Sequence, residues 1–63
     1  SIGLELTNLA KKTGSMKTSL GTINLKDQND QLKSTFDILT ELYPMWQKMS
    51  ENEKSQIGLL IAG

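Results

Sequence analysis

Residues 32–54 read LKSTFDILTELYPMWQKMSENEK and contain two patterns that are typical of helix starts. In each, a serine is followed three positions later by an acidic residue: Ser34 by Asp37, and Ser50 by Glu53. The serine hydroxyl of such a pattern accepts a hydrogen bond from a free N–H of the first helical turn, and the acid favours the positive helix end. We therefore expect one helix to begin directly after each serine.

The first predicted helix covers residues 35–49 and carries apolar side chains at every third or fourth position. This spacing places them on one face, which we expect to be buried. Pro44 lies within the helix and has no N–H to donate to the carbonyl of Thr40. The helix must therefore either kink at Pro44 or restart with the proline in its first turn, and we expect the kink.

The second predicted helix covers residues 51–62. It contains Gly58, which lowers helix stability by about 1 kcal/mol relative to alanine, and this indicates a close approach by another helix. Joined through a short connection, the two helices form a helical hairpin over residues 34–63 whose apolar faces meet.

Eight apolar residues are expected to carry the fold, as core or as interface. Trp46 is the only tryptophan, and it is either the centre of the core or an anchor for a partner. The eight are Phe36, Leu39, Leu42, Trp46, Met49, Ile57, Leu60 and Ile61.

The first half of the chain has weaker patterns. Residues 1–21 are expected to form a short helix, at about residues 3–12, followed by an irregular connection with glycines. Residues 22–33 contain DQND, whose Asn and Asp tolerate left-handed backbone, so a turn, small hairpin or extended loop is expected there. The predicted fold class is therefore mainly all-α, a small helical module with a helical hairpin.

Composition limits what the chain can do. A domain of 63 residues buries only about 60% of its unfolded surface, and without Cys or His it has neither disulfides nor zinc to add stability. We therefore expect the chain to need a partner surface. We also expect it to be a fragment of a longer chain, since the sequence opens on Ser1 and closes on apolar GLLIAG. Seven Lys balance seven Asp and Glu, so no nucleic acid is expected, and no apolar run is long enough for a membrane span.

The sequence offers no strong pattern for catalysis, a cofactor or a metal, and we expect none of them. Asp27, Asn29 and Gln31 do match the first, third and fifth positions of a calcium-binding loop. However, Leu32 and Ile38 stand where that loop needs its glycine and its bidentate glutamate. A solvated turn is therefore the better interpretation.

Four segments occur in a recognisable order: LKD at 25–27, DQLKSTFDILTEL at 30–42, MWQKMSENEKSQI at 45–57, and LLIAG at 59–63. Together they resemble the core region of phage tail tape measure proteins, from long-tailed phages and prophages of Gram-positive bacteria. The chain departs from that family at Asn29 or Asp30, where a glycine is common, and at Pro44, where a helix former is usual.

The resemblance implies a structural part of a virion, assembled in the host bacterial cytoplasm. Such a protein is very long and mostly helical, sets the length of the tail tube, and lies in the tube lumen with several copies side by side. Its implied partners are further copies of itself and the tail tube and tail assembly proteins. The alternative, taken from the residues alone, is a small helical adaptor that presents Tyr43, Met45, Trp46 and Met49 to a partner groove.

Overall fold

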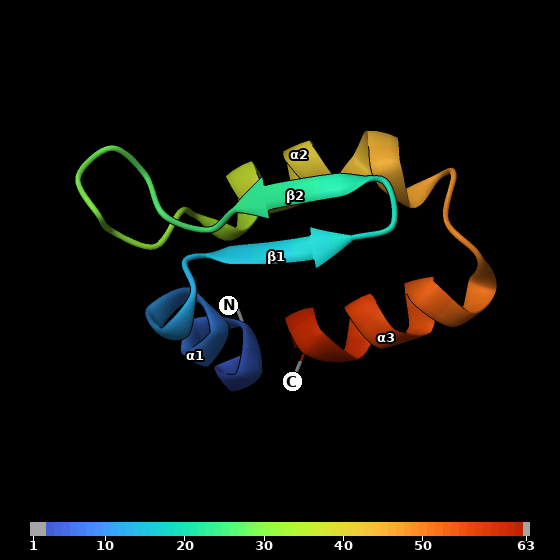
Figure 1. Ribbon diagram of the computed structural model, residues 1–63, viewed down its shortest axis with the longest axis horizontal. Coiled ribbons are helices and arrows are strands. Elements are labelled where there is room, and N and C mark those ends of the chain that lie inside the picture. The colour runs from blue at the N-terminus through green and yellow to red at the C-terminus, as the bar shows by residue number, and fades with distance from the viewer. Residues whose placement is uncertain (1–2, 63) are drawn as a thin grey trace.

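The computed structural model describes residues 3–62, and within them it contains three helices and one two-stranded antiparallel sheet (Figure 1). The expectation of a mainly all-α fold is therefore wrong, and the chain is a small mixed α and β domain. A strand pair replaces most of the irregular connection that was predicted before residue 22. The elements in chain order are α1 (Leu4–Lys12), β1 (Ser15–Thr18), β2 (Gly21–Asn24), α2 (Thr35–Trp46) and α3 (Glu51–Ala62).

The two strands form a tight hairpin whose register pairs Met16 with Ile23 and Thr18 with Gly21. The Thr18 hydroxyl donates to the carbonyl of Gly21 at 2.7 Å and accepts from the N–H of Leu20 at 3.1 Å. Gly21 has a φ of +148°, a conformation that favours glycine. Each strand buries only one side chain, Met16 or Ile23, so the alternation that identifies a strand is too short to be read from sequence.

A turn follows the hairpin and is closed by a bridge between Lys26 and Leu32. The Asp27 carboxylate accepts hydrogen bonds from the backbone N–H groups of Asn29, at 2.8 Å, and Gln31, at 3.1 Å. Asp30 is left-handed, with φ +61°, which confirms the backbone predicted for DQND. Asp27 thus shapes the turn with the same carboxylate that a calcium loop would use as a ligand.

Both predicted helix caps are confirmed. Ser34 Oγ accepts from the N–H of Asp37, and Ser50 Oγ accepts from the N–H of Glu53, each at 3.1 Å. Helix α2 runs unbroken across Pro44, so it does not restart there, but it ends at Trp46 instead of residue 49. Beyond the end of α2 the chain continues in tight turns. The N–H groups of Lys48 and Met49 each donate to the carbonyl three residues earlier, at 3.0 Å and 3.1 Å.

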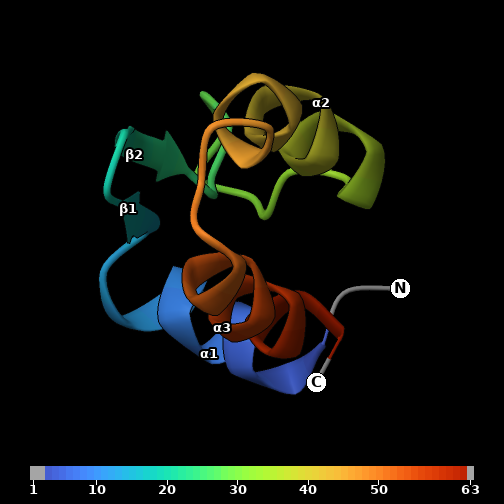
Figure 2. The same ribbon diagram turned by 90° about the vertical axis from the view of Figure 1, so that its right-hand side faces the viewer.

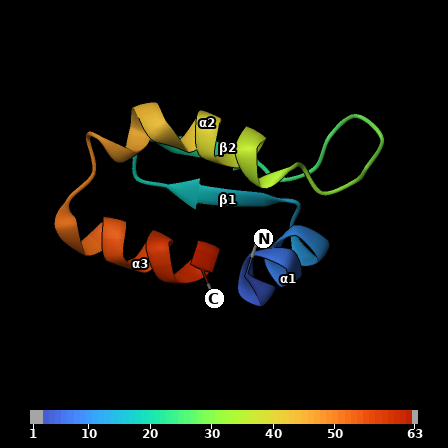
Figure 3. The same cartoon turned by 180° about the vertical axis from the view of Figure 1, so that it is seen from behind.

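The hairpin lies between two groups of helices. Helix α2 packs along β2, whereas α1 packs against β1 and against α3, as the end-on view shows (Figure 2). From behind, α2 lies in front of the strands and the connection to α3 passes beside the tip of the hairpin (Figure 3). The core is apolar and draws on every element; its buried residues are Leu6, Ala10, Met16, Ile23, Leu25, Ile38, Leu42, Met49 and Ile57.

The predicted burial of Phe36 is wrong, because its side chain is 77% exposed. Helix α2 buries Ile38 and Leu42, one turn apart, against the sheet. At about 100° per residue, Phe36 lies about 200° around the helix from Ile38, on the opposite side. The hairpin thus selects a different face of α2 from the one that the apolar spacing suggested.

Candidate functional site

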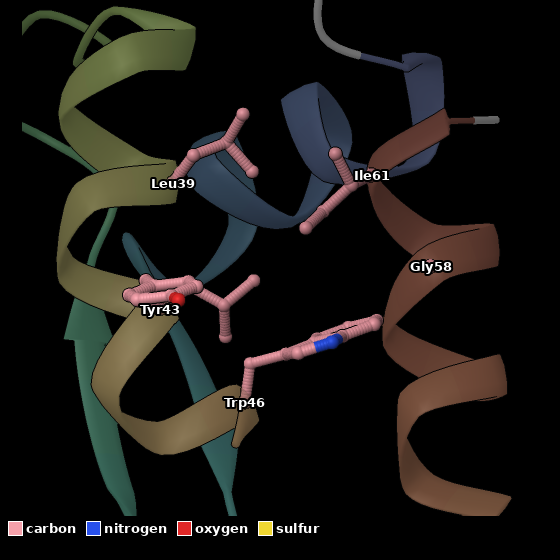
Figure 4. Close-up of a pocket in the computed structure, with 6 residues that line it drawn as sticks. Leu39, Tyr43, Trp46, Gly58 and Ile61 are labelled. Atoms are coloured by element: carbon pink, nitrogen blue, oxygen red, sulfur yellow. The ribbon is translucent and has the colours of Figure 1, made fainter. Parts of the chain in front are cut away.

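An apolar groove lies between α2 and α3, with a volume of about 430 Å³ (Figure 4). The groove corrects the expectation that the apolar faces of the two helices meet along their length. Its lining contains two polar side-chain groups, the Tyr43 hydroxyl and the Trp46 indole N–H, and the hydroxyl already accepts from Gln47 Nε2 at 3.0 Å. The lining residues are Leu39, Leu42, Tyr43, Trp46, Gly58 and Ile61.

Trp46 spans the groove from α2 to the backbone of α3 (Figure 4). A Cβ atom placed on Gly58 would lie 4.0 Å from the Trp46 ring, an ordinary van der Waals distance. The expectation that the backbone of another helix approaches Gly58 closely is therefore wrong, and the neighbouring group is an aromatic side chain in ordinary contact. The indole forms one end of the groove, and Leu39 and Ile61 face each other across it.

The side of α2 that faces away from the sheet carries three exposed apolar side chains, which we call the outer stripe: Phe36, Leu39 and Tyr43. They are 77%, 44% and 62% exposed. A second depression is lined by the outer stripe together with Thr40. Because Leu39 and Tyr43 line both hollows, the outer stripe and the groove form one continuous apolar surface.

The eight residues predicted as core or interface fall into three groups. Leu42, Met49 and Ile57 are buried. Trp46, Leu60 and Ile61 are half-buried and pack against the core. Phe36 and Leu39 are exposed on α2.

The side chains of the adaptor hypothesis are also spread over different environments. Tyr43 is exposed, Met45 and Trp46 are half-buried, and Met49 is buried. The four therefore do not share one surface, and Tyr43 alone belongs to the outer stripe.

Several core residues were missing from the predicted set. Leu6 and Ala10 have helical spacing in the sequence, which could have identified them. Met16 and Ile23 become buried only because the strands pair, and no local pattern marks them. Ile38 was not among the eight predicted residues, but it is 1% exposed and lies in the core.

A polar contact joins the hairpin to α3. The backbone N–H of Ser19 donates to Glu53 Oε2 at 2.9 Å, and the Ser19 hydroxyl donates to Glu53 Oε1. These two hydrogen bonds, the hydroxyl's first, hold the pKa of Glu53 below its ordinary value. The sequence gives no indication of this contact, since 34 positions separate the two residues.

No group of three or more His, Cys, Asp or Glu side chains within residues 3–62 is placed to hold a metal ion. Likewise, none of the helices described combines the length and the hydrophobicity needed to cross a bilayer. Comparison of the chain with models of known protein families, with characterised proteins and with solved structures finds no match.

Proposed function

We propose that this chain is a structural segment of a phage tail tape measure protein, which takes part in setting tail length and in tail assembly within the tube lumen. The ordered resemblance of residues 25–63 supports this proposal. The observation that carries it on the geometric side is the outer stripe, which an isolated domain would leave in water. The work of the segment is mechanical and associative, and no catalytic step is assigned to it.

The proposed partner of the outer stripe is a second copy of the chain. An aromatic side chain offers about 150–250 Å² of contact surface, so Phe36 and Tyr43 provide roughly 250 Å² in their exposed parts. Apolar patches of a few hundred Å² commonly mark interaction sites. The formal net charge is zero, so two copies approach without net repulsion.

The surroundings of the outer stripe suit such a packing. Glu41 lies on the same helix and its carboxylate pairs with Lys33 at 2.9 Å, which removes a free acidic group from this part of α2. Aromatic side chains prefer offset or edge-to-face contacts with other aromatics, and Phe36 and Tyr43 lie about two turns apart on the same side of α2. Two antiparallel copies of α2 would therefore place the phenylalanine of each near the tyrosine of the other. Tail tube and tail assembly proteins are further proposed partners.

The proposed location is the virion, after assembly in the host bacterial cytoplasm. An antibody raised against the chain should detect a band in purified phage particles induced from the source cells. A band found only in the cell lysate, and absent from particles, would contradict the proposal and favour the adaptor hypothesis. Particles of an unrelated phage, blotted in parallel, control for antibody cross-reaction.

A further inference from the structure

The tip of the β hairpin, residues 18–21, contacts both helices that border the groove. On the α2 side, the Thr18 hydroxyl, whose hydrogen is donated to the carbonyl of Gly21, lies 3.7 Å from the sulfur of Met45. A Cβ atom on Gly21 would lie 3.3 Å from the terminal methyl of Met45, so the backbone of the tip is in close contact with that side chain. The tip thus packs against the carboxyl-terminal part of α2.

On the α3 side, the same tip holds the first turn of the helix. Ser19 donates two hydrogen bonds to the Glu53 carboxylate, one from its backbone and one from its hydroxyl. Residues 47–50, which connect α2 to α3, pass beside the hairpin tip (Figures 1 and 3). The tip therefore lies at the joint of the two helices, in contact with Met45 of α2 and hydrogen-bonded to Glu53 of α3.

The other end of α3 is also held by an element other than α2. Helix α1 packs against α3, and the N–H of Gly3 donates to the carbonyl of Ile61 at 2.7 Å. Across the groove, contact between α2 and α3 depends on the Trp46 ring over Gly58. Apolar walls in water tend to close on each other, because closure removes their surface from the solvent. A groove that stays open needs something to hold its walls apart.

We propose that the hairpin tip is a strut, which holds α2 and α3 apart at their joint and so keeps the apolar groove between them open. Releasing Glu53 from Ser19 lets the first turn of α3 move towards α2, and the groove then closes over Trp46. The strut would regulate the continuous apolar surface on which the proposed function rests. Its test uses the isolated chain and requires neither association of copies nor phage particles.

The Glu53 carboxylate makes the strut sensitive to pH. Protonation removes the negative charge of the carboxylate and so weakens the hydrogen bonds that it accepts from Ser19. The nearby charges on α3, Glu51 and Lys54, pair with each other at 3.0 Å. Within residues 3–62, neither Lys17 on β1 nor Lys48 in the connection forms an ion pair with Glu53.

The distance between the two helices tests the strut directly. The chain has no cysteine, so the double variant Thr40→Cys with Gln56→Cys takes spin labels on exposed positions of α2 and α3 only. Pulsed electron paramagnetic resonance then measures the separation of the labels in dilute protein. Adding Glu53→Ala, which removes both acceptor oxygens, should shift the distance distribution to shorter values and the Trp46 emission to shorter wavelengths, because the ring leaves water.

The matched control is Glu51→Ala, which removes a carboxylate from the same helical turn but leaves Ser19 bonded to Glu53. It should leave the distance unchanged. An unchanged or longer distance in the Glu53→Ala protein would overturn the strut, given a helical circular dichroism spectrum like that of the parent.

If Glu53→Ala does not fold, Ser19→Ala provides a milder test. It removes the hydroxyl hydrogen bond and keeps the backbone one. It should shorten the distance by a smaller amount, and no shortening would count against the proposal. A shortened distance in a protein that never associates would uphold the strut while contradicting the proposed packing of copies.

Discussion

The two sides of α2 are both apolar, yet they have opposite environments. Ile38 and Leu42 are buried against the sheet, whereas Phe36 and Tyr43 are exposed on the outer stripe. The same helix therefore contributes to the core with one side and presents a hydrophobic surface with the other. Apolar spacing thus identifies a helix, but the element packed against it decides which side is buried.

Truncating one side chain on each side of α2 should give the largest difference in the free energy of unfolding. Ile38→Ala should lower the free energy of unfolding by about 2–5 kcal/mol, because it leaves a cavity in a closely packed core. Phe36→Ala should change it by no more than about 0.5 kcal/mol, as for a surface position. Urea unfolding followed by circular dichroism measures both.

A domain of this size has roughly 3–9 kcal/mol of stability, so Ile38→Ala is expected to leave much of the chain unfolded at 25 °C. A loss of similar size for Phe36→Ala would show that the outer stripe belongs to the core. The distinction between the two sides of α2 would then disappear.

The N-terminal cap of α2 stabilises the helix as a whole and therefore both of its sides. Ser34→Ala should lower the stability by about 1 kcal/mol, because the N–H of Asp37 loses its acceptor. Ser55→Ala in the exposed interior of α3 is the matched control and should have little effect, since Ser55 caps no helix. Equal losses in the two variants, compared by urea unfolding, would argue against the capping interpretation.

The wall of the groove offers a stabilising change. Gly58→Ala should raise the free energy of unfolding by about 0.5–1 kcal/mol, because alanine is the better helix former. The added methyl meets the Trp46 ring at an ordinary van der Waals distance, so no strain is expected. Thermal unfolding checks this, and a lower midpoint would show that the added methyl lies closer than 4.0 Å to the Trp46 ring.

The smallest expected effect concerns pH. The pKa of Glu53 is lower in the folded chain than in the unfolded chain, so its contribution to stability is present above the unfolded pKa. That contribution is lost as the pH falls through the folded pKa. Unfolding measured across this acidic range should show a smaller decline for Glu53→Gln than for the parent, whereas Glu51→Gln should behave like the parent.

Local patterns predicted the parts of the fold that depend on local chemistry. The serine caps at Ser34 and Ser50 and the left-handed backbone at Asp30 follow from side chains bonding to the nearby backbone, and the sequence displays them. The β hairpin was missed as a strand pair because Met16 and Ile23 are buried only through long-range packing.

The candidate site was predicted less well than the helix starts. The apolar content of α2 was visible, but its arc is wide enough to offer two faces for burial, Ile38 with Leu42 or Phe36 with Leu39. Only the position of β2 decides between them. The contact between Ser19 and Glu53 could not be anticipated, because it depends on how the hairpin tip meets α3.

The proposed packing of copies requires that the outer stripe causes the chain to associate in solution. In sedimentation velocity over a range of concentrations, the parent should sediment faster as the concentration rises. The double variant Phe36→Ser with Tyr43→Ser should remain monomeric with an unchanged helical spectrum. Leu59→Ser, at an apolar position on α3 that is 70% exposed and outside the groove lining, should associate like the parent. A parent that stays monomeric, or a double variant that associates as strongly as the parent, would contradict association through the outer stripe.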